Sequence, residues 1–191
     1  MKRTVRTFVA VETSAAIRKS AAGLIERLRA AEVDVKWVET ENMHLTLKFL
    51  GEVPTLEIPE VCQAVQRGAA AVEPFEFEIR GAGAFPSAGR PRTVWLGSGE
   101  GEKEMVALHG HVEARLTKLG YRKEHRRFLP HLTLGRVRGG GPTMAPLGEL
   151  IQHNADFPAG RVTVSEVVVF SSQLTSDGPI YAVLGRGRLG G

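Results

Sequence analysis

The chain has 191 residues, of which 42% are hydrophobic and 24% charged, a composition that excludes a disordered chain and fits a globular protein. Its 25 Lys and Arg residues exceed its 21 Asp and Glu residues, and the net charge of +4 permits an anionic partner without requiring one. The single cysteine, Cys62, excludes an intrachain disulfide and a cysteine-based zinc site. No apolar run has the length of a membrane span or the form of a signal peptide, so we expect a soluble, cytoplasmic protein.

Hydrophobic periodicity predicts strands and helices that alternate along the chain. Strands are expected over residues 5–11, 35–38, 44–50, 75–79, 93–96, 131–137, 162–170 and 180–184. Amphipathic helices are expected over residues 14–31, 58–72, 105–119 and 145–153, the first capped by Thr13 or Ser14. Because two predicted strands often follow one another, the order favours an α+β fold with largely antiparallel sheets.

Three segments are rich in glycine, and two of them also contain proline, a composition typical of irregular structure. Residues 81–91 are expected to form a loop, and residues 139–142 a turn. Residues 185–191 are rich in glycine and are expected to form a frayed C-terminal tail.

The tetrapeptide H-L-T-L occurs twice, starting at His44 and at His131. Side chains alternate between the two faces of a strand, so His44 shares one face with Thr46, and the leucines lie on the other. In the second copy, His131 and Thr133 share a face in the same way. If the two sheets face each other, the cleft between them contains two imidazoles and two hydroxyls.

These groups suit phosphoryl transfer with one acid and one base. Imidazole titrates near pH 6.5, so one histidine can take a proton while the other gives one, and threonine hydroxyls can donate to phosphate oxygens. A single histidine in a strand is usually structural, and a zinc site built from His44, His131 and a third histidine is a second alternative. The remaining histidines offer no H-x-x-x-H pairing and no carboxylate cluster accompanies them, which disfavours a metal.

With their flanks, ENMHLTLKFLGEV and RFLPHLTLGRV, the two motifs resemble the paired H-x-T-x signatures of the 2H phosphoesterase superfamily. The chain is most similar to its RNA 2′,3′-cyclic phosphodiesterase family, also called 2′-5′ RNA ligases, over nearly its whole length. The resemblance implies a bilobal α+β fold, with two mainly antiparallel sheets facing a central cleft and helices on the outside. Residues 1–184 would form one bilobal catalytic domain with one motif in each lobe, followed by the tail of residues 185–191.

The resemblance also implies an activity, namely hydrolysis of 2′,3′-cyclic phosphate ends of RNA to a 2′-phosphate without metal or cofactor. His44 would be the proton donor toward the ribose 3′-oxygen and His131 the proton acceptor from water, although the two roles could be exchanged. Run in reverse, the same site could join a cyclic phosphate to a 5′-hydroxyl as a 2′-5′ linkage. The expected partner is RNA, with tRNA fragments as one candidate, and the expected state is a monomer.

Four further residues are candidates for substrate binding, each with a structural alternative. Arg126 precedes the second motif and could donate two hydrogen bonds to phosphate, or lie in a solvated basic loop. Lys48 would share the strand face of His44 and line the cleft, or lie at its rim. Phe85 could stack on a base and Tyr181 could reach the site through its hydroxyl, although aromatic residues more often pack in the core.

Strict alternation along the motif strands makes two more predictions. Phe49 would point away from His44 into the core, and Arg136 would lie on the leucine face, outside the site. Gly135 stands where family members often have alanine. Arg90 and Arg92, in the predicted loop, could follow an RNA backbone or simply be solvated.

Two other functions remain open at this point. The protein could bind RNA ends or a nucleotide without turnover, although a binding module could lose a histidine freely and neither is lost here. It could also be a 2H esterase for another small cyclic phosphate, such as ADP-ribose 1″,2″-cyclic phosphate. A panel of cyclic phosphate substrates would separate these possibilities.

Overall fold

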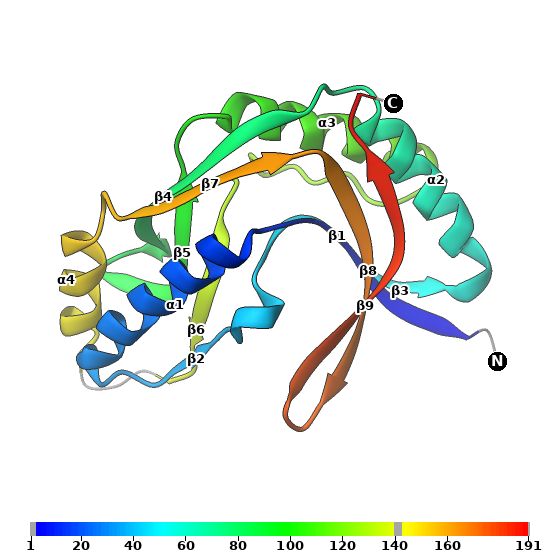
Figure 1. Cartoon of the computed structure of the whole chain (residues 1–191). Helices are drawn as coiled ribbons and strands as arrows, with labels where there is room; N and C mark the ends of the chain where they lie inside the picture. The colour runs from blue at the N-terminus through cyan, green and yellow to red at the C-terminus, as the bar shows by residue number, and fades with distance from the viewer. Residues whose placement is uncertain (1–2, 140–142, 191) are drawn as a thin grey trace.

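The fold is known from a computed structural model that describes residues 3–139 and 143–190. It contains two curved antiparallel sheets, with the helices on their outer sides (Figure 1). In chain order the elements are β1 (Thr4–Glu12), α1 (Ala15–Leu28), β2 (Val35–Trp37), β3 (His44–Pro54), α2 (Ile58–Ala69), β4 (Phe75–Ser87), β5 (Arg90–Ser98), α3 (Glu102–Lys118), β6 (Leu132–Val137), α4 (Ala145–His153), β7 (Pro158–Val164), β8 (Glu166–Thr175) and β9 (Gly178–Arg188). The predicted α+β class is therefore confirmed.

The two motif strands belong to different sheets. One sheet has the strand order β3-β1-β8-β9 and the other the order β2-β6-β5-β4-β7, so β3 and β6 contribute one motif to each. Helix α2 packs on β8 and β9, whereas α4 packs on β4 and β5 and α1 on β7 (Figure 1). Helices thus cover one face of each sheet.

A continuous hydrophobic core connects the two sheets and their helices. The leucines of both motifs belong to it, because Leu45, Leu47, Leu132 and Leu134 are each at most 2% exposed. The predicted anchoring of the motifs by leucine is therefore confirmed. The first helix begins as predicted, since the Ser14 hydroxyl accepts a hydrogen bond from the backbone N–H of Ile17 at 3.2 Å.

The glycine-rich segments differ from their predictions. Residues 81–91 form no long loop: β4 continues to Ser87 and β5 begins at Arg90, with paired backbones on either side of a tight turn. The backbone of glycine can pair in a β-ladder like that of other residues, so the glycine and proline content of this segment led to a wrong prediction of a loop. Residues 162–170 likewise divide between β7 and β8, which lie in different sheets.

The C-terminal residues are part of the fold and not a frayed tail. Strand β9 extends to Arg188, and Leu189 is buried. Gly185 and Gly187 lie against α2 so closely that a Cβ at position 185 would come within 2.6 Å of the Cys62 sulfur. The glycines are thus a packing requirement. The end of the chain at Gly191 and most of the predicted turn, residues 140–142, lie outside the described residues.

Candidate active site

Each motif histidine is fixed in the same way. Nδ1 of His44 lies 2.7 Å from the carbonyl oxygen of Asn42, and Nδ1 of His131 lies 2.7 Å from that of Leu129. A carbonyl can only accept, so the hydrogen of each ring lies on Nδ1 and Nε2 is left free to take or give a proton. The strands that carry the motifs, β3 and β6, pass within 8 Å of each other between Cα atoms.

Burial lowers the pKa of both imidazoles below the ordinary value. For His44 the hydrogen bond to Asn42 opposes this shift, and for His131 the bond to Leu129 does the same. The positive charge of Arg136 lowers the pKa of His131 further. In the free protein both rings are therefore mainly neutral at pH 7, the form that a general base needs, and an acid must gain its proton when an anionic ligand binds.

Both motif strands contain a β-bulge at the second leucine. In β3, Thr46 and Lys48 pair with adjacent residues of β1, so that Leu47 is the extra residue. In β6 the extra residue is Leu134, which occupies the same place in the motif. Because a bulge shifts the alternation by one position, the residues that follow it face the side opposite to the one predicted.

Lys48 is the first residue affected, and its predicted place in the cleft is wrong. The side chain is 3% exposed and points into the interior, where Nζ lies 2.8 Å from Oε2 of Glu113. Nζ also donates to the carbonyl of Arg122 at 2.8 Å, and the backbone N–H of Glu124 donates to the Glu113 carboxylate. Although burial alone would raise the pKa of Glu113, these donors hold it below its ordinary value.

This buried network connects the first motif to the segment before the second. Lys48 lies in β3, Glu113 in α3, and the two backbone partners lie in the loop that leads to β6. The Phe128 ring in the same loop stacks on His109 of α3, with ring centroids 4.1 Å apart. Lys48 thus holds the approach to His131 in place and cannot contact a ligand in the cleft.

Phe49 and Arg136 follow the two bulges, and both lie on the cleft side. Phe49 is 60% exposed rather than buried in the core as predicted, and its ring lies 5.9 Å from that of Phe8. Arg136 was predicted to lie outside the site, but it lines a cavity beside the first motif and its charge acts on His131. Sequence analysis missed Arg136 because strict alternation ignores the bulge. Phe49 and Arg136 occupy the same position relative to the histidine of their motif, so the bulge affects both in the same way.

The Tyr181 cavity, of about 380 Å³, is lined by Phe8, Phe49, Tyr181 and Arg136, among others; His44 is not among its lining residues, although two of these rings contact it. The Phe8 ring stacks on His44 with centroids 4.8 Å apart, and Tyr181 meets His44 edge-on at 5.3 Å. The Tyr181 ring therefore lies next to the first motif histidine, whereas the reach of its hydroxyl into the site stays a prediction. Arg136 comes from the other sheet, so this cavity spans the two lobes.

The Trp95 cavity, of about 290 Å³, lies beside the second histidine and is lined by His131, Phe85, Trp95 and Leu129, among others. The Phe85 ring meets His131 edge-on, with centroids 5.0 Å apart. Phe85 thus lies next to the second motif, where it could contact a base as predicted, but it belongs to strand β4 and not to a loop.

The remaining candidates are placed as follows. Thr46 and Thr133 are half-buried, and neither hydroxyl has a hydrogen-bond partner within residues 3–139 and 143–190. Arg126 is exposed in the loop before β6 and lines neither cavity. At Gly135 a Cβ would come within 2.7 Å of Val35, so the space that an alanine would need is occupied here.

Two general features bear on the class of site. In the described part of the chain, no group of three or more His, Cys, Asp or Glu side chains is arranged to hold a metal ion. Nor does any helix there combine the length and hydropathy needed to cross a bilayer.

Comparison with known proteins identifies the family. The sequence model of the 2′-5′ RNA ligase superfamily matches residues 17–175. A protein of Methanothermobacter thermautotrophicus named RNA 2′,3′-cyclic phosphodiesterase is 39% identical over 93% of this chain and 95% of its own. A protein of the same name from Thermotoga maritima is 36% identical over 94% of this chain and 93% of its own.

Solved structures confirm the fold. A crystal structure from Thermus thermophilus superposes with a TM-score of 0.76 at 28% identity, covering 97% of this chain and 98% of that one. Escherichia coli LigT in complex with 3′-AMP superposes with a TM-score of 0.77 at 24% identity, covering 98% and 99% of the two chains. The fold and the paired motifs define a 2H phosphoesterase. The chain belongs to the 2′-5′ RNA ligase superfamily, and the resemblance seen in its sequence is confirmed.

Proposed function

We propose that this protein hydrolyses 2′,3′-cyclic phosphate ends of RNA to 2′-phosphates, with His44 as proton donor and His131 as proton acceptor and without a metal ion. One observation carries the proposal: both motif histidines hold Nδ1 on a backbone carbonyl at 2.7 Å, which leaves both Nε2 atoms available for proton transfer. The names of the full-length relatives support the choice of substrate.

The roles of the two rings follow from the direction of the reaction. His131 takes a proton from water, the water oxygen attacks phosphorus, and the bond from phosphorus to the ribose 3′-oxygen breaks. His44 gives its proton to that oxygen, which leaves the phosphate on the 2′-oxygen. The lowered pKa of His131 suits a base at neutral pH, and the approach of the phosphate anion favours the protonated form of His44.

The hydroxyls of Thr46 and Thr133 are proposed to donate to the non-bridging phosphate oxygens, where charge builds up in the transition state. They flank the histidines on the same strand faces and are not used by other described residues. Arg136 takes the place in the site that was expected for Lys48, since it lines the Tyr181 cavity and its guanidinium can pair with a phosphate.

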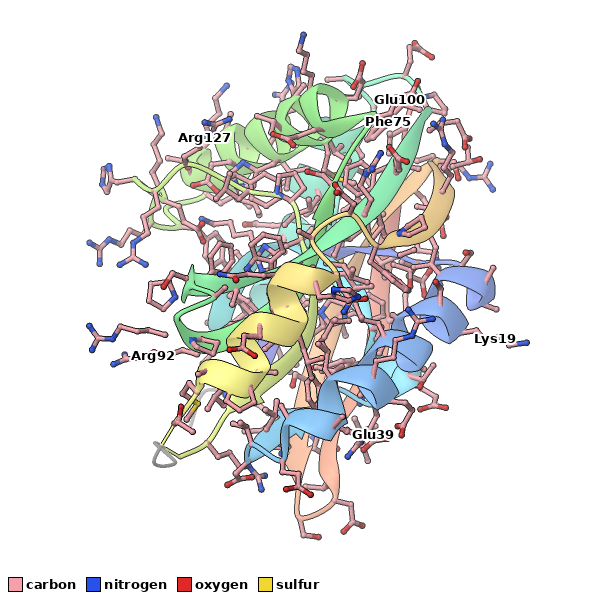
Figure 2. All side chains as sticks on the ribbon, turned by 90° about the vertical axis from the view of Figure 1, so that its left-hand side faces the viewer. Lys19, Glu39, Phe75, Arg92, Glu100 and Arg127 are labelled. Atoms are coloured by element: carbon pink, nitrogen blue, oxygen red, sulfur yellow. The ribbon has the colours of Figure 1, made fainter. Side chains whose placement is uncertain are left out.

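RNA beyond the terminal nucleotide would be held by charge. Arg92 and Arg127 extend into solvent on the same side of the molecule (Figure 2), and the chain carries a net charge of +4. Arg126 lies beside Arg127 and is proposed to take part in this contact, whereas Phe85 and Tyr181 are proposed to contact the substrate in the cleft. We propose that both lobes form one catalytic domain that is monomeric and cytoplasmic, with tRNA fragments among its substrates.

Product analysis tests the proposal. A defined oligonucleotide with a 2′,3′-cyclic phosphate end is incubated with the protein in excess EDTA, and phosphorus NMR assigns the product. We expect turnover to the 2′-phosphate alone. A 3′-phosphate would contradict the proposed leaving oxygen, and a strict metal requirement would contradict the two-histidine mechanism. Binding of the oligonucleotide without turnover would favour an RNA-end binding protein. If ADP-ribose 1″,2″-cyclic phosphate, offered in a parallel reaction, were the only substrate turned over, the protein would instead be a 2H esterase for that small cyclic phosphate.

A further inference from the structure

Asn42 lies where the first motif meets the hairpin of β8 and β9. It is the last residue of a short 3₁₀ helix, Thr40–Asn42, just before the motif strand β3. Its backbone carbonyl accepts the hydrogen bond from Nδ1 of His44 at 2.7 Å. Its side-chain Nδ2 donates to the carbonyl oxygen of Pro179 at 3.1 Å, across 137 positions of the sequence. One half-buried residue thus contacts both the proposed proton donor and a distant strand.

The bond to Pro179 matters because β9 is an edge strand. The sheet order β3-β1-β8-β9 leaves one side of β9 without a neighbouring strand, so carbonyl groups on that side need donors from elsewhere. The Asn42 amide supplies a donor at Pro179, two residues before Tyr181. The side chain of Asn42 therefore holds the part of β9 that carries the Tyr181 ring.

The Tyr181 ring covers the proposed proton donor. It meets His44 edge-on with ring centroids 5.3 Å apart, and it meets Phe8 edge-on at 4.9 Å. The hairpin that carries Tyr181 extends beyond the other strands of its sheet (Figure 1), and residues 173–177 at its tip are exposed. The amide of Asn42 is thus a contact that ties this extended part of the hairpin to the motif.

In the second half-site an apolar residue occupies the corresponding position. The carbonyl that holds Nδ1 of His131 belongs to Leu129, and the leucine side chain has no atom that can donate a hydrogen bond. This side chain is 44% exposed. Both imidazoles are thus oriented by a backbone carbonyl, but only the residue that orients His44 can also bind a neighbouring strand through its side chain.

We infer that Asn42 is a positioning residue, which keeps the Tyr181 ring against His44 through its side-chain bond to Pro179. Its carbonyl orients the imidazole, and its amide fixes the strand that covers that imidazole. The inference rests on the proposed function, because it makes Asn42 serve the proton donor of that reaction. Without the amide, the end of β9 can move away from His44 and water can reach the ring.

The groups around His44 determine what this exposure to water would do. The rings that face it from β1, β8 and β9 are Phe8, Phe170 and Tyr181, and burial raises the pKa of the Tyr181 phenol, so that it stays uncharged. Glu12, which pairs with His44 in the β1–β3 ladder, is held by Arg186 at 2.8 Å.

The shift of the His44 pKa has two causes, burial, which lowers it, and the bond to Asn42, which raises it. No charged side chain of the described residues is among these causes. Loss of the covering ring should therefore raise the His44 pKa toward its ordinary value.

A titration of the free protein tests the link. Asn42→Leu keeps the backbone carbonyl and the size of the side chain but removes the donor to Pro179. NMR titration of the histidine ring protons should show a higher pKa for His44 than in the wild type and an unchanged pKa for His131. An unchanged or lower His44 pKa in the folded variant would overturn the inference, whether or not the protein hydrolyses RNA.

Gln173→Leu is the matched control. Gln173 is exposed on β8 in the same hairpin, and its neighbour Ser172 pairs with Tyr181, so alternation places Gln173 on the opposite face. The substitution makes the same change from amide to alkyl group and should leave the His44 pKa in place. An equal rise in this variant would attribute the effect to the hairpin in general and would contradict the assignment to Asn42.

A double-mutant cycle on kcat/KM tests the route through Tyr181. The substrate is the oligonucleotide with a 2′,3′-cyclic phosphate end, and the variants are Asn42→Leu, Tyr181→Leu and the double variant. We expect Asn42→Leu to lower kcat/KM about fivefold in the wild-type background, as loss of one ordinary hydrogen bond predicts, and to have no further effect when Tyr181 is already replaced. Losses that multiply in the double variant would overturn the route through Tyr181. Absence of turnover by the wild type would refute the proposed function, and the NMR titration would still decide the link.

Discussion

The half-site around His44 and the half-site around His131 are built on the same local plan. Each begins with an imidazole whose Nδ1 hydrogen is held by the carbonyl two residues earlier, and each has a bulge at the second leucine. The histidine, the threonine and the leucines of each motif therefore have equivalent orientations. The features that the local sequence of a short strand determines, namely side-chain orientation and the Nδ1 hydrogen bond, are therefore the same in both lobes.

The two half-sites differ immediately after the bulge, where side chains meet the rest of the fold. In the first, Lys48 enters a buried ion pair and Phe49 lies in the cleft. In the second, Gly135 leaves room for Val35, and Arg136 brings a charge into the cleft. The common part suits proton transfer, whereas the residues after the two bulges bring one aromatic and one charged side chain to the same Tyr181 cavity.

Removing either imidazole should have the largest effect. We expect His44→Ala and His131→Ala each to lower kcat by about 10²- to 10⁴-fold, because each deletes one proton transfer. Thermal unfolding should show that both variants remain folded, and His111→Ala, on the exposed side of α3, should keep wild-type activity. Substantial activity in one of the two variants would show that the half-sites do not act as an acid and base pair.

The same variants can distinguish the acid from the base. An activated phosphodiester whose leaving group needs no proton should restore turnover to His44→Ala and not to His131→Ala. Rescue of His131→Ala instead would make His131 the acid and His44 the base. Water would then attack from the side of His44, and the leaving oxygen would depart on the side of His131.

Lys48→Met tests the first difference between the half-sites. It leaves the Glu113 carboxylate buried without its partner, which typically costs about 3–5 kcal/mol of unfolding free energy. Denaturant titration measures the loss, and the double variant Lys48→Met/Glu113→Leu should recover much of it because no lone charge remains. Lys36→Met, on an exposed position of β2, is the control and should change stability by less than about 0.5 kcal/mol. Equal stability of Lys48→Met and wild type would contradict the buried network.

Arg136→Gln tests the second difference and should have the smallest effect. The charge of Arg136 lowers the pKa of His131, so its removal raises that pKa. The acidic limb of kcat/KM, where His131 must lose its proton, should then move to higher pH. Arg138→Gln, two residues further along, should leave the limb in place; a shift in the opposite direction in Arg136→Gln would contradict the proposed base.

Predictions from the sequence were correct where they depended on local pattern. The repeated H-L-T-L motif located both histidines and their leucine anchors, and helical periodicity gave α4 its observed bounds. They were wrong for Lys48, Phe49 and Arg136 through one cause, the bulge at the second leucine. They were also wrong for residues 81–91 and for the C-terminal glycines, where composition indicated irregular structure and pairing with neighbouring strands produced β4, β5 and β9.

The sequence by itself therefore determined which groups the paired motifs present, namely two imidazoles and two hydroxyls on strand faces with period two. Only the tertiary structure decided what surrounds them. A bulge, a hydrogen bond from the Asn42 amide to β9, and a cavity that spans two lobes each depend on a partner strand far away in sequence. A periodic pattern carries information about which side of its own strand a residue faces, and none about the strand it will meet.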